Sequence, residues 1–278
     1  KYFKEEKPAV KDNGNTGLFE GKNVIMVMME SLDDWMIDEK YTPTISHMMK
    51  NGINFTDNYA ATFGTGYTFN TEFAVNSGYH AMVSGMSVTT LSKNTYEYSL
   101  PNLFKAKGYT PTSFHFNSPD FYNRGIMHKA WGYESYVSFS DYMPGKEAQL
   151  DSNIISDDKV FEKMTENQKF FDFIITYSAH VPYTYDDDKL LEAKEKYPEL
   201  IDTSQGTDPE INNAKILAHD TDEFFRILTE KLEAKGILDD TVIIAFADHF
   251  TYGVSSWDKL YALSDVSTAK LLEKTPLF

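Results

Sequence analysis

One segment, Asn23-Val24-Ile25-Met26-Val27-Met28-Met29-Glu30-Ser31, is an apolar run that ends abruptly in a carboxylate. A continuous Val, Ile and Met run between Gly21 and polar residues is typical of a strand buried on both faces, as central parallel strands are. Ligands of open α/β sheets bind just beyond the carboxyl ends of the strands, where Glu30 would lie. The alternative is that Glu30 points into water, and this segment alone does not decide between the two.

The composition predicts one large α/β domain. The chain has 278 residues, 41% hydrophobic and 15% aromatic, and a single core of that size buries roughly three quarters of the unfolded surface. No apolar run approaches the length of a membrane span. The net charge of -16 argues against nucleic acid as a partner, because that affinity comes from Lys and Arg on phosphates. The absence of cysteine excludes disulfides, thiolate metal sites and a cysteine nucleophile.

Both ends of the sequence suggest a piece of a longer protein. The chain begins at Lys1 without methionine, and the polar residues 1–20 read as a linker or tether. It stops at Phe278, inside what looks like the beginning of another strand. We therefore expect a catalytic domain over residues 21–278 that is incomplete at its C-terminus.

Helices and strands alternate along most of the chain. N-caps, Pro and Gly punctuation and helical spacing predict helices over 42–52, 99–108, 156–164 and 208–235. Apolar or alternating runs predict further strands over 52–59, 109–116, 170–178 and 241–247. This alternation predicts a mostly parallel sheet with helices on both faces. The acidic stretch 186–197 is expected to be a solvated face.

A Gly- and Thr-rich loop runs into a helix between Ala61 and Phe73. Glycines let the backbone approach a ligand, and a hydroxyl at a helix N-terminus sits in a positive field that suits a phosphate or an alkoxide. The commoner role of such a threonine is that of an N-cap. Several threonines compete in this loop, and their spacing does not choose among them.

Four predicted strands end in side chains that can perform chemistry. These are Glu30, His115, His180 and the pair Asp248-His249. Parallel strands deliver their carboxyl ends to one edge of the sheet, so we expect these side chains to meet. An acid and an imidazole side by side after a buried strand are a common way to present two metal ligands. The sequence therefore predicts a metal-assisted site at this edge.

Other charged residues near these ends have less specific interpretations. Asp33 and Asp34 could form a metal pair, but a helix start also favours solvated carboxylates at that place. Arg124 and two aromatic rings follow the strand that ends near His115, and the forked donors of arginine suit a phosphate. Taken singly, His115 also fits packing and Arg124 also fits a surface ion pair.

Five motifs follow one another along the chain. They are Asn-Val-Ile-x-Val-x-x-Glu-Ser at 23–31, Gly-x-Thr-x-x-x-Glu-Phe at 66–73, His115 followed by Phe-Tyr-Asn-Arg at 121–124, Ser-x-His-x-Pro-Tyr at 178–183, and Asp248-His249. As an ordered set spanning most of the chain, they resemble the extracellular domain of lipoteichoic acid synthases. That family consists of sulfatase-like phosphoglycerol transferases of Gram-positive bacteria.

The resemblance implies a sulfatase and alkaline-phosphatase-like fold with one metal ion. Mn²⁺, with Mg²⁺ as an alternative, would be held by Glu30, Thr68, Asp248 and His249. Thr68 is implied to be the nucleophile, and the reaction would pass through a phosphothreonine-type covalent intermediate. A threonine hydroxyl is a poor nucleophile until a metal lowers its pKa, and such an oxygen-rich ligand set suits Mn²⁺ or Mg²⁺.

The resemblance also implies a substrate and the groups that hold it. His115, Arg124 and His180 would surround the phosphate, and Tyr122 would lie against the glycerol. His180 could also protonate the leaving diacylglycerol oxygen. The enzyme would take glycerol phosphate from phosphatidylglycerol and pass it to a glycolipid or polyglycerolphosphate acceptor in lipoteichoic acid synthesis. The family places this domain on the extracellular face of the membrane, behind an N-terminal membrane anchor, from which it is also released by cleavage.

Two departures from the family bear on these expectations. Tyr122 stands where synthases have Trp, which keeps a flat ring and is expected to affect the preferred head group or acceptor. The family also continues into further strands where this sequence stops at Phe278.

Several alternatives stay open. A primase or a glycan-directed phosphoglycerol transferase would share every site residue named above. Another metal-dependent phosphodiesterase or phosphatase of the same fold is a second alternative, and a two-metal form would need Asp33 or Asp34 as a further ligand. A third is a non-catalytic ectodomain that binds glycerophosphate polymers. A sulfatase that works through an oxidised cysteine is disfavoured, because the chain has none.

Overall fold

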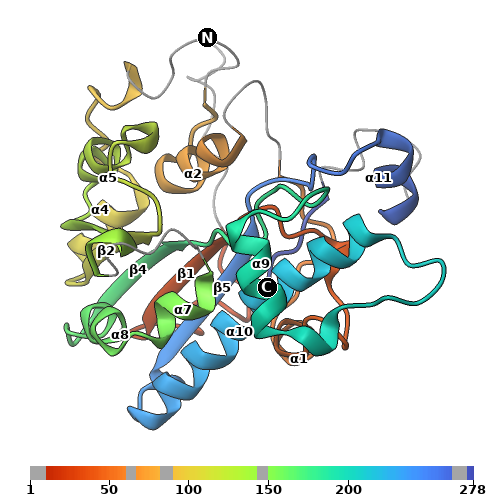
Figure 1. Ribbon diagram of the computed structural model, residues 1–278. Coiled ribbons are helices and arrows are strands. Elements are labelled where there is room, and N and C mark those ends of the chain that lie inside the picture. Colours follow the sequence, from red (N-terminus) through yellow and green to blue (C-terminus); the bar gives the residue numbers. More distant parts are fainter. Residues whose placement is uncertain (1–10, 61–66, 82–89, 143–149, 265–273) are drawn as a thin grey trace.

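A parallel sheet of five strands in the order β3-β2-β4-β1-β5 lies at the centre of the described structure (Figure 1). The computed structural model describes residues 11–60, 67–81, 90–142, 150–264 and 274–278. The strands are β1 (Asn23–Met29), β2 (Thr110–His115), β3 (Ser135–Ser138), β4 (Phe170–Ile175) and β5 (Thr241–Ala247). β1 lies between β4 and β5, and Val27 is in register with Ile174 and Ala245.

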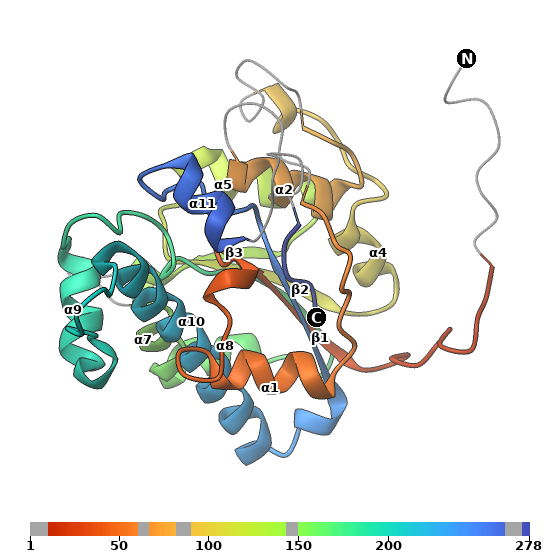
Figure 2. The ribbon, with the colours of Figure 1, turned by 90° about the vertical axis from the view of Figure 1, so that its right-hand side faces the viewer.

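The sheet separates two hydrophobic cores, because successive side chains of each strand point to opposite faces. In β1, Ile25 and Val27 contribute to one core, whereas Val24 and Met28 contribute to the other. The first core is covered by α1 (Pro43–Asn51), α7 (Asp151–Ser156), α8 (Asp158–Met164), α9 (Asp188–Lys196) and α10 (Pro209–Ala234). The second is covered by α2 (Tyr67–Ser77), α4 (Leu100–Ala106) and α5 (Arg124–Trp131). Figures 1 and 2 show these two layers, and the predicted α/β fold with helices on both faces is confirmed.

Local sequence signals set the ends of several helices. α1 begins after its N-cap Thr42 with proline at the first position, and Gly52 follows its last residue. The N-cap Asp208 of α10 accepts a hydrogen bond from the backbone N–H of Glu210. These helices therefore form where the sequence predicts them. No helix among the described residues is both long enough and apolar enough to cross a membrane.

The strand predicted over residues 52–59 is wrong. Ile53 and Phe55 alternate with polar residues, but their side chains are 49% and 55% exposed. The segment pairs with the C-terminal residues through the hydrogen bonds from Phe55 N to Leu277 O and from Thr275 N to Asn58 O, and through an isolated bridge between Tyr59 and Lys274. The fifth strand of the sheet is instead β3, which the sequence analysis did not identify.

Two further predictions concern surface segments. The stretch 186–197 is only partly solvated, because α9 forms there and buries Lys189, Leu190 and Ala193. In the predicted linker, residues 1–10 lie outside the described residues, and residues 11–21 are exposed and contain successive turns. At the other end, Phe278 exchanges two backbone hydrogen bonds with Ala245 of β5, at 2.7 and 2.9 Å.

A carboxyl group is buried in the middle of the sheet. Asp172 lies in β4, and neither of its carboxyl oxygens has a hydrogen-bond partner among the described residues. Burial, and then the charge of Glu166, raise the pKa of Asp172 well above its ordinary value. The folded state therefore retains a proton that the unfolded state loses above about pH 4, so this residue makes stability fall as the pH rises from there.

We expect the Asp172→Val variant to be more stable than the parent protein. At pH 7 the free energy of unfolding should rise by about 1–3 kcal/mol, the usual penalty for an unpaired buried polar group. The gain should be smaller at pH 4, where the carboxyl is closer to neutral in both states. Urea unfolding at the two pH values measures this.

Asp222 provides the matched control, because it is equally buried but accepts backbone hydrogen bonds from Thr44 and Ile45 of α1, at 3.2 and 2.7 Å. The Asp222→Val variant should be less stable than the parent. Equal losses for the two variants would mean that Asp172 has stabilising contacts after all.

Candidate active site

The carboxyl ends of β1 and β5 bring three potential metal ligands together. Glu30 directly follows β1, and Asp248 and His249 directly follow β5. His249 Nε2 lies 3.4 Å from Glu30 Oε1 and 3.1 Å from Asp248 Oδ2. One ligand atom from each residue lies within 4.8 Å of the others, and all three residues are buried. These strand ends therefore meet, as the parallel sheet predicts.

Thr68 joins this cluster from the first turn of α2. Its Oγ1 donates a hydrogen bond to Glu30 Oε2 at 3.1 Å. Thr71 Oγ1 donates to the backbone oxygen of Asp248 at 2.5 Å, so α2 is attached to both strand ends. The rest of the Gly- and Thr-rich loop, residues 61–66, lies outside the described residues. Of the two threonines, Thr68 is the one whose hydroxyl contacts the side-chain carboxylate of a potential metal ligand, whereas Thr71 contacts a backbone oxygen.

Ser31 holds the two carboxylates in place from a strained backbone position. Its φ is 53°, in the left-handed region that non-glycine residues rarely adopt. Its N–H donates to Asp248 Oδ1 and its hydroxyl donates to Glu30 Oε1, both at 2.9 Å. Its carbonyl accepts a hydrogen bond from Thr251 Oγ1 at 2.8 Å. Such strain persists where the surroundings fix the conformation, as they do at many functional sites.

The charges of the cluster depend on one another. Burial acts to raise the pKa of Glu30, but the hydrogen bond and charge of His249 outweigh it and hold that pKa well below its usual range. Burial, and then the charge of Glu30, raise the pKa of Asp248. Burial disfavours the imidazolium of His249, yet Asp248 and Glu30 raise its pKa well above the ordinary value. The site therefore favours positive charge between its two carboxylates, and a divalent cation would supply that charge.

The donor set fits a metal ion. Carboxylate and hydroxyl oxygens suit Mn²⁺ and Mg²⁺, and imidazole is a common transition-metal ligand. His249 Nδ1 lies 2.9 Å from the carbonyl oxygen of Phe250, which can only accept, so Nδ1 keeps its proton and Nε2 faces the carboxylates. Asp248 Oδ2 is buried without a hydrogen-bond partner among the described residues. Glu30, Thr68, Asp248 and His249 could thus hold one cation.

A second buried group connects α2 to α5. Glu72 accepts hydrogen bonds from Arg124 Nε at 3.0 and 3.2 Å and from His128 Nε2 at 2.5 Å. All three side chains are buried, so Arg124 does not form the surface ion pair that its position in the sequence also allowed. No role for Glu72 was predicted from the sequence. The feature that could have indicated one is its spacing of four residues from Thr68, which places both side chains on one face of the helix.

Tyr122 reaches over this group from a short 3-10 helix, η3 (Phe121–Asn123). Tyr122 and Asn123 both have left-handed backbones, with φ of 52° and 53°. The Tyr122 ring lies with its centroid 5.1 Å from the guanidinium carbon of Arg124 and 6.0 Å from the ring centroid of Phe69 in α2. The ring is half-buried. It therefore forms a flat, partly accessible surface beside the arginine.

His115 is the last residue of β2 and is almost completely buried. Its Nδ1 lies 2.9 Å from the carbonyl oxygen of Ile175 and must donate to it, so Nε2 is free of a proton when the ring is neutral. Burial, and then the charge of Arg124, lower the pKa of His115 to about 3. The ring is therefore neutral near pH 7 and can accept a hydrogen bond through Nε2.

His180 lies five residues beyond β4 and is partly exposed. Its ring stacks on that of Tyr177, with centroids 5.0 Å apart and an angle of 12° between the planes. Its Nδ1 lies 2.8 Å from the carbonyl oxygen of Val181. The imidazole is among the groups that lower the pKa of Glu30, so it lies close enough to act on that carboxylate.

Asp33 lies close to the site but outside the metal cluster. Asp33 is buried, contrary to the solvated position expected for it, and accepts hydrogen bonds from the backbone N–H groups of Asp34 and Thr251 at 2.8 and 3.1 Å. Burial raises the pKa of Asp33 to about 7. Among the described residues, the only group of three or more acidic or imidazole side chains with metal-ligand spacing is the one around Glu30.

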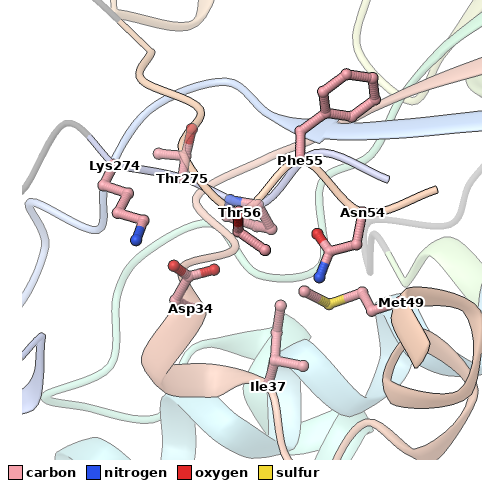
Figure 3. Close-up of a pocket in the computed structure, with 9 residues that line it drawn as sticks. Asp34, Ile37, Met49, Asn54, Phe55, Thr56, Lys274 and Thr275 are labelled. Atoms are coloured by element: carbon pink, nitrogen blue, oxygen red, sulfur yellow. The ribbon is translucent and has the colours of Figure 1, made fainter.

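Two surface cavities lie beside the segment 53–60 and the C-terminal residues. The first, of about 330 Å³, lies between Asp34, Phe55 and Lys274, and Figure 3 shows Asp34 and Lys274 pointing towards each other across it. The second, of about 340 Å³, lies between α2 and β5 and is mainly apolar. Neither is lined by Glu30, Thr68 or His249.

The fold and the buried Glu, Asp and His cluster define the class of the protein. The sulfatase family matches residues 22–263, and the chain belongs to this family. Among characterised proteins, it is similar to lipoteichoic acid synthase 2 of Bacillus subtilis, with 29% identity over 289 residues. That match covers 97% of this chain and 42% of the relative, so the chain spans less than half of that protein. The resemblance stated from the motifs is confirmed.

Solved structures share the fold. The crystal structure of the lipoteichoic acid synthase LtaP from Listeria monocytogenes has a TM-score of 0.78 at 21% identity, covering 94% of this chain and 66% of that one. A protein of the alkaline phosphatase superfamily from Vibrio parahaemolyticus has a TM-score of 0.64 at 23% identity, covering 92% and 59%. The predicted sulfatase and alkaline-phosphatase-like fold is therefore confirmed.

Proposed function

We propose that the domain is a metal-dependent phosphoglycerol transferase that takes glycerol phosphate from phosphatidylglycerol for polyglycerolphosphate lipoteichoic acid synthesis. The observation that carries this proposal is the Thr68 hydroxyl, held 3.1 Å from Glu30 beside a potential metal site. The similarity to lipoteichoic acid synthases supports the choice of substrate. Glu30, Thr68, Asp248 and His249 would hold the cation, with Mn²⁺ as the first choice and Mg²⁺ as the second.

In the first half-reaction, Thr68 would lose its hydroxyl proton to solvent, and its Oγ1 would attack the phosphorus of phosphatidylglycerol as the alkoxide. When bound, the cation would lower the pKa of the Thr68 hydroxyl and offset the negative charge of the phosphate. The bond between phosphorus and the diacylglycerol oxygen breaks, and His180 donates a proton to that oxygen. Diacylglycerol leaves, and glycerol phosphate remains as an ester of Thr68.

In the second half-reaction, an acceptor hydroxyl would attack the phosphorus of the Thr68 ester. His180, now without its proton, takes the proton of that hydroxyl, the bond between phosphorus and Thr68 Oγ1 breaks, and Thr68 leaves as the alkoxide with which the first half-reaction began. The acceptor is a glycolipid or the end of a growing polyglycerolphosphate chain. The partly exposed position of His180 suits a group that meets both a lipid and an acceptor.

Three other side chains would hold the substrate. Arg124 supplies positive charge to the phosphate from a position fixed by Glu72. His115 is neutral, so it would accept a hydrogen bond from a substrate hydroxyl instead of pairing with the phosphate charge. Tyr122 offers a flat, half-buried ring to the glycerol. We place this chemistry on the extracellular face of a bacterial membrane, with residues 1–20 as the tether to an anchor.

The test is release of diacylglycerol from phosphatidylglycerol in detergent micelles. We expect release with Mn²⁺ and none after chelation, and we expect phosphatidylethanolamine to be a poor substrate. Equal turnover of the two lipids would contradict recognition of the glycerol head group. Metal binding without any turnover of phosphatidylglycerol would favour a glycerophosphate-binding ectodomain.

A further inference from the structure

The loop that carries His180 is held by hydrogen bonds along its backbone. Asp151 accepts from the N–H groups of Tyr177 and Ser178 at 2.7 and 2.9 Å. The His180 N–H donates to the carbonyl oxygen of Tyr177 at 3.0 Å. Tyr183 donates its hydroxyl proton to the carbonyl oxygen of Ala179 at 2.6 Å. Each residue from 177 to 180 thus has at least one fixed backbone group.

Lys189 closes this arrangement from α9. Its Nζ donates to the carbonyl oxygens of Ser178 and His180 at 2.7 and 2.5 Å. One ammonium group therefore joins the first and the last residue of the segment 178–180. Nζ also lies 5.7 Å from the centroid of the Tyr177 ring, on which the His180 imidazole stacks. Lys189 therefore contacts both the backbone of His180 and the ring beneath its side chain.

Buried carboxylates balance this ammonium group. Asp151 and Asp220 are fully buried, and Ser178 connects them by donating its hydroxyl proton to Asp220 at 2.6 Å while accepting from Asp151 N at 2.7 Å. Lys189 is itself almost fully buried. Burial lowers the pKa of Lys189 to about 8, with Asp187 and Asp151 acting in the opposite direction.

Burying the three ionisable groups Asp151, Asp220 and Lys189 costs desolvation free energy, and apolar packing of similar volume is often at least as stabilising. A fully satisfied polar network does, however, fix one geometry. Asp151 and Asp220 also accept hydrogen bonds from Ser152, Tyr197 and Thr221, so these carboxylates hold several elements together. Both hydrogen bonds of Lys189, by contrast, end on residues 178 and 180, in a loop that presents one imidazole to the site. This placement indicates that Lys189 serves the position of that ring.

We propose that Lys189 is a positioning residue for His180, acting through the two backbone carbonyls and the Tyr177 ring. This inference rests on the proposed function only for the expected fall in kcat; the effect of Lys189 on the position of the His180 ring does not depend on it. The side chain of Lys189 itself does not touch the substrate. Misplacing a catalytic group by about 1 Å can reduce turnover by roughly a hundredfold.

The test compares Lys189→Met with Lys194→Met. Methionine keeps most of the volume of lysine and removes the donors. Lys194 lies on the same helix and, within the described part of the chain, pairs with Asp186 alone, so it is the matched control. For Lys189→Met we expect kcat to fall by roughly 10–100-fold with KM and Mn²⁺ binding unchanged. Lys194→Met should match the parent protein.

Two further measurements separate positioning from general destabilisation. If Lys189 acts through His180, the double variant Lys189→Met/His180→Gln should be no slower than His180→Gln alone, whereas independent effects would multiply. The NMR cross-peak of the His180 imidazole, assigned with His180→Gln, should shift and broaden in Lys189→Met. Multiplying losses, or an unchanged cross-peak in a folded Lys189→Met protein, would overturn the proposal.

Tyr183→Phe keeps the test valid if Lys189→Met does not fold. It removes only the hydroxyl that donates to Ala179, and the same cross-peak should shift by a smaller amount. An unchanged cross-peak in this variant would also count against the proposal. Because the NMR measurement needs no substrate, an inactive parent protein would refute the proposed function without affecting this result.

Discussion

Replacement of Thr68 by alanine is expected to abolish diacylglycerol release, with a loss of roughly 10³-fold or more, as for removal of other covalent nucleophiles. The reason is that Thr68 Oγ1 is the hydroxyl held on Glu30 beside the metal cluster. Turnover of phosphatidylglycerol by Thr68→Ala and the parent protein measures the loss. Mass spectrometry of the parent protein, quenched during turnover, should find glycerol phosphate on the peptide that contains Thr68.

Thr68→Ser is the matched control, because it keeps the hydroxyl and should retain measurable turnover. Thr68→Ala should still bind Mn²⁺ through the three remaining ligands, with lower affinity. Full activity of Thr68→Ala would assign the nucleophile to another residue. Modification of a different peptide in the quenched protein would lead to the same conclusion.

Removal of the metal is expected to abolish activity and to lower thermal stability. A ligand that binds only the folded state at a hundred times its Kd adds about 2.7 kcal/mol. For a domain of this size that corresponds to roughly 5–10 °C in Tm. The physical reason is that two buried carboxylates, Glu30 and Asp248, lie close together, and a cation bound between them would stabilise the pair. Thermal unfolding with Mn²⁺ and with a chelator measures the shift.

The Asp248→Asn variant should lose the Mn²⁺-dependent rise in Tm. Asp33→Asn is the matched control, since Asp33 is also buried nearby but lies outside the cluster, so this variant should keep the shift. Titration should give one equivalent of Mn²⁺. Two equivalents in the parent protein and one in Asp33→Asn would instead support a two-metal hydrolase.

The sequence predicts the centre of this fold well because the strands there are buried on both faces. A strand with neighbours on each side and helices on both faces must be almost entirely apolar, as β1 and β4 are apart from Asn23 and Asp172, so it stands out in the sequence. The positions of Glu30 and of Asp248-His249 follow from the ends of such strands. The motifs then indicated Thr68, which spacing alone left undecided among several threonines.

The periphery of the sheet is harder to predict. β3 has four residues, two of them serines, and only one neighbouring strand, so it carries no clear hydrophobic pattern. Residues 52–59 show alternation but have no apolar surface to cover, and their side chains stay exposed. Alternation indicates a strand only where one face of the segment packs against a hydrophobic core. Which segments pack in this way cannot be read from the local sequence.

Buried polar partners were also missed, for a different reason. Glu72, Asp220 and Lys189 look like surface residues when read singly, because charged side chains usually are. Each is buried against a partner that is distant in the sequence: Glu72 and Arg124 are 52 residues apart. Such pairs become visible only after the fold has brought their elements together.

The position of β1 in the sheet has a consequence for the order in which the molecule can be assembled. β1 is the earliest strand in the chain, yet both of its neighbours come much later, and the bond between Ser31 and Asp248 joins residues 217 apart. A polypeptide that emerges N-terminus first therefore holds β1 without either neighbour until residues 170–175 are available, and with one edge unpaired until residues 241–247 follow. Because Asp248 and His249 follow the last of these strands, the cluster around Glu30 is assembled only when nearly the whole domain has folded.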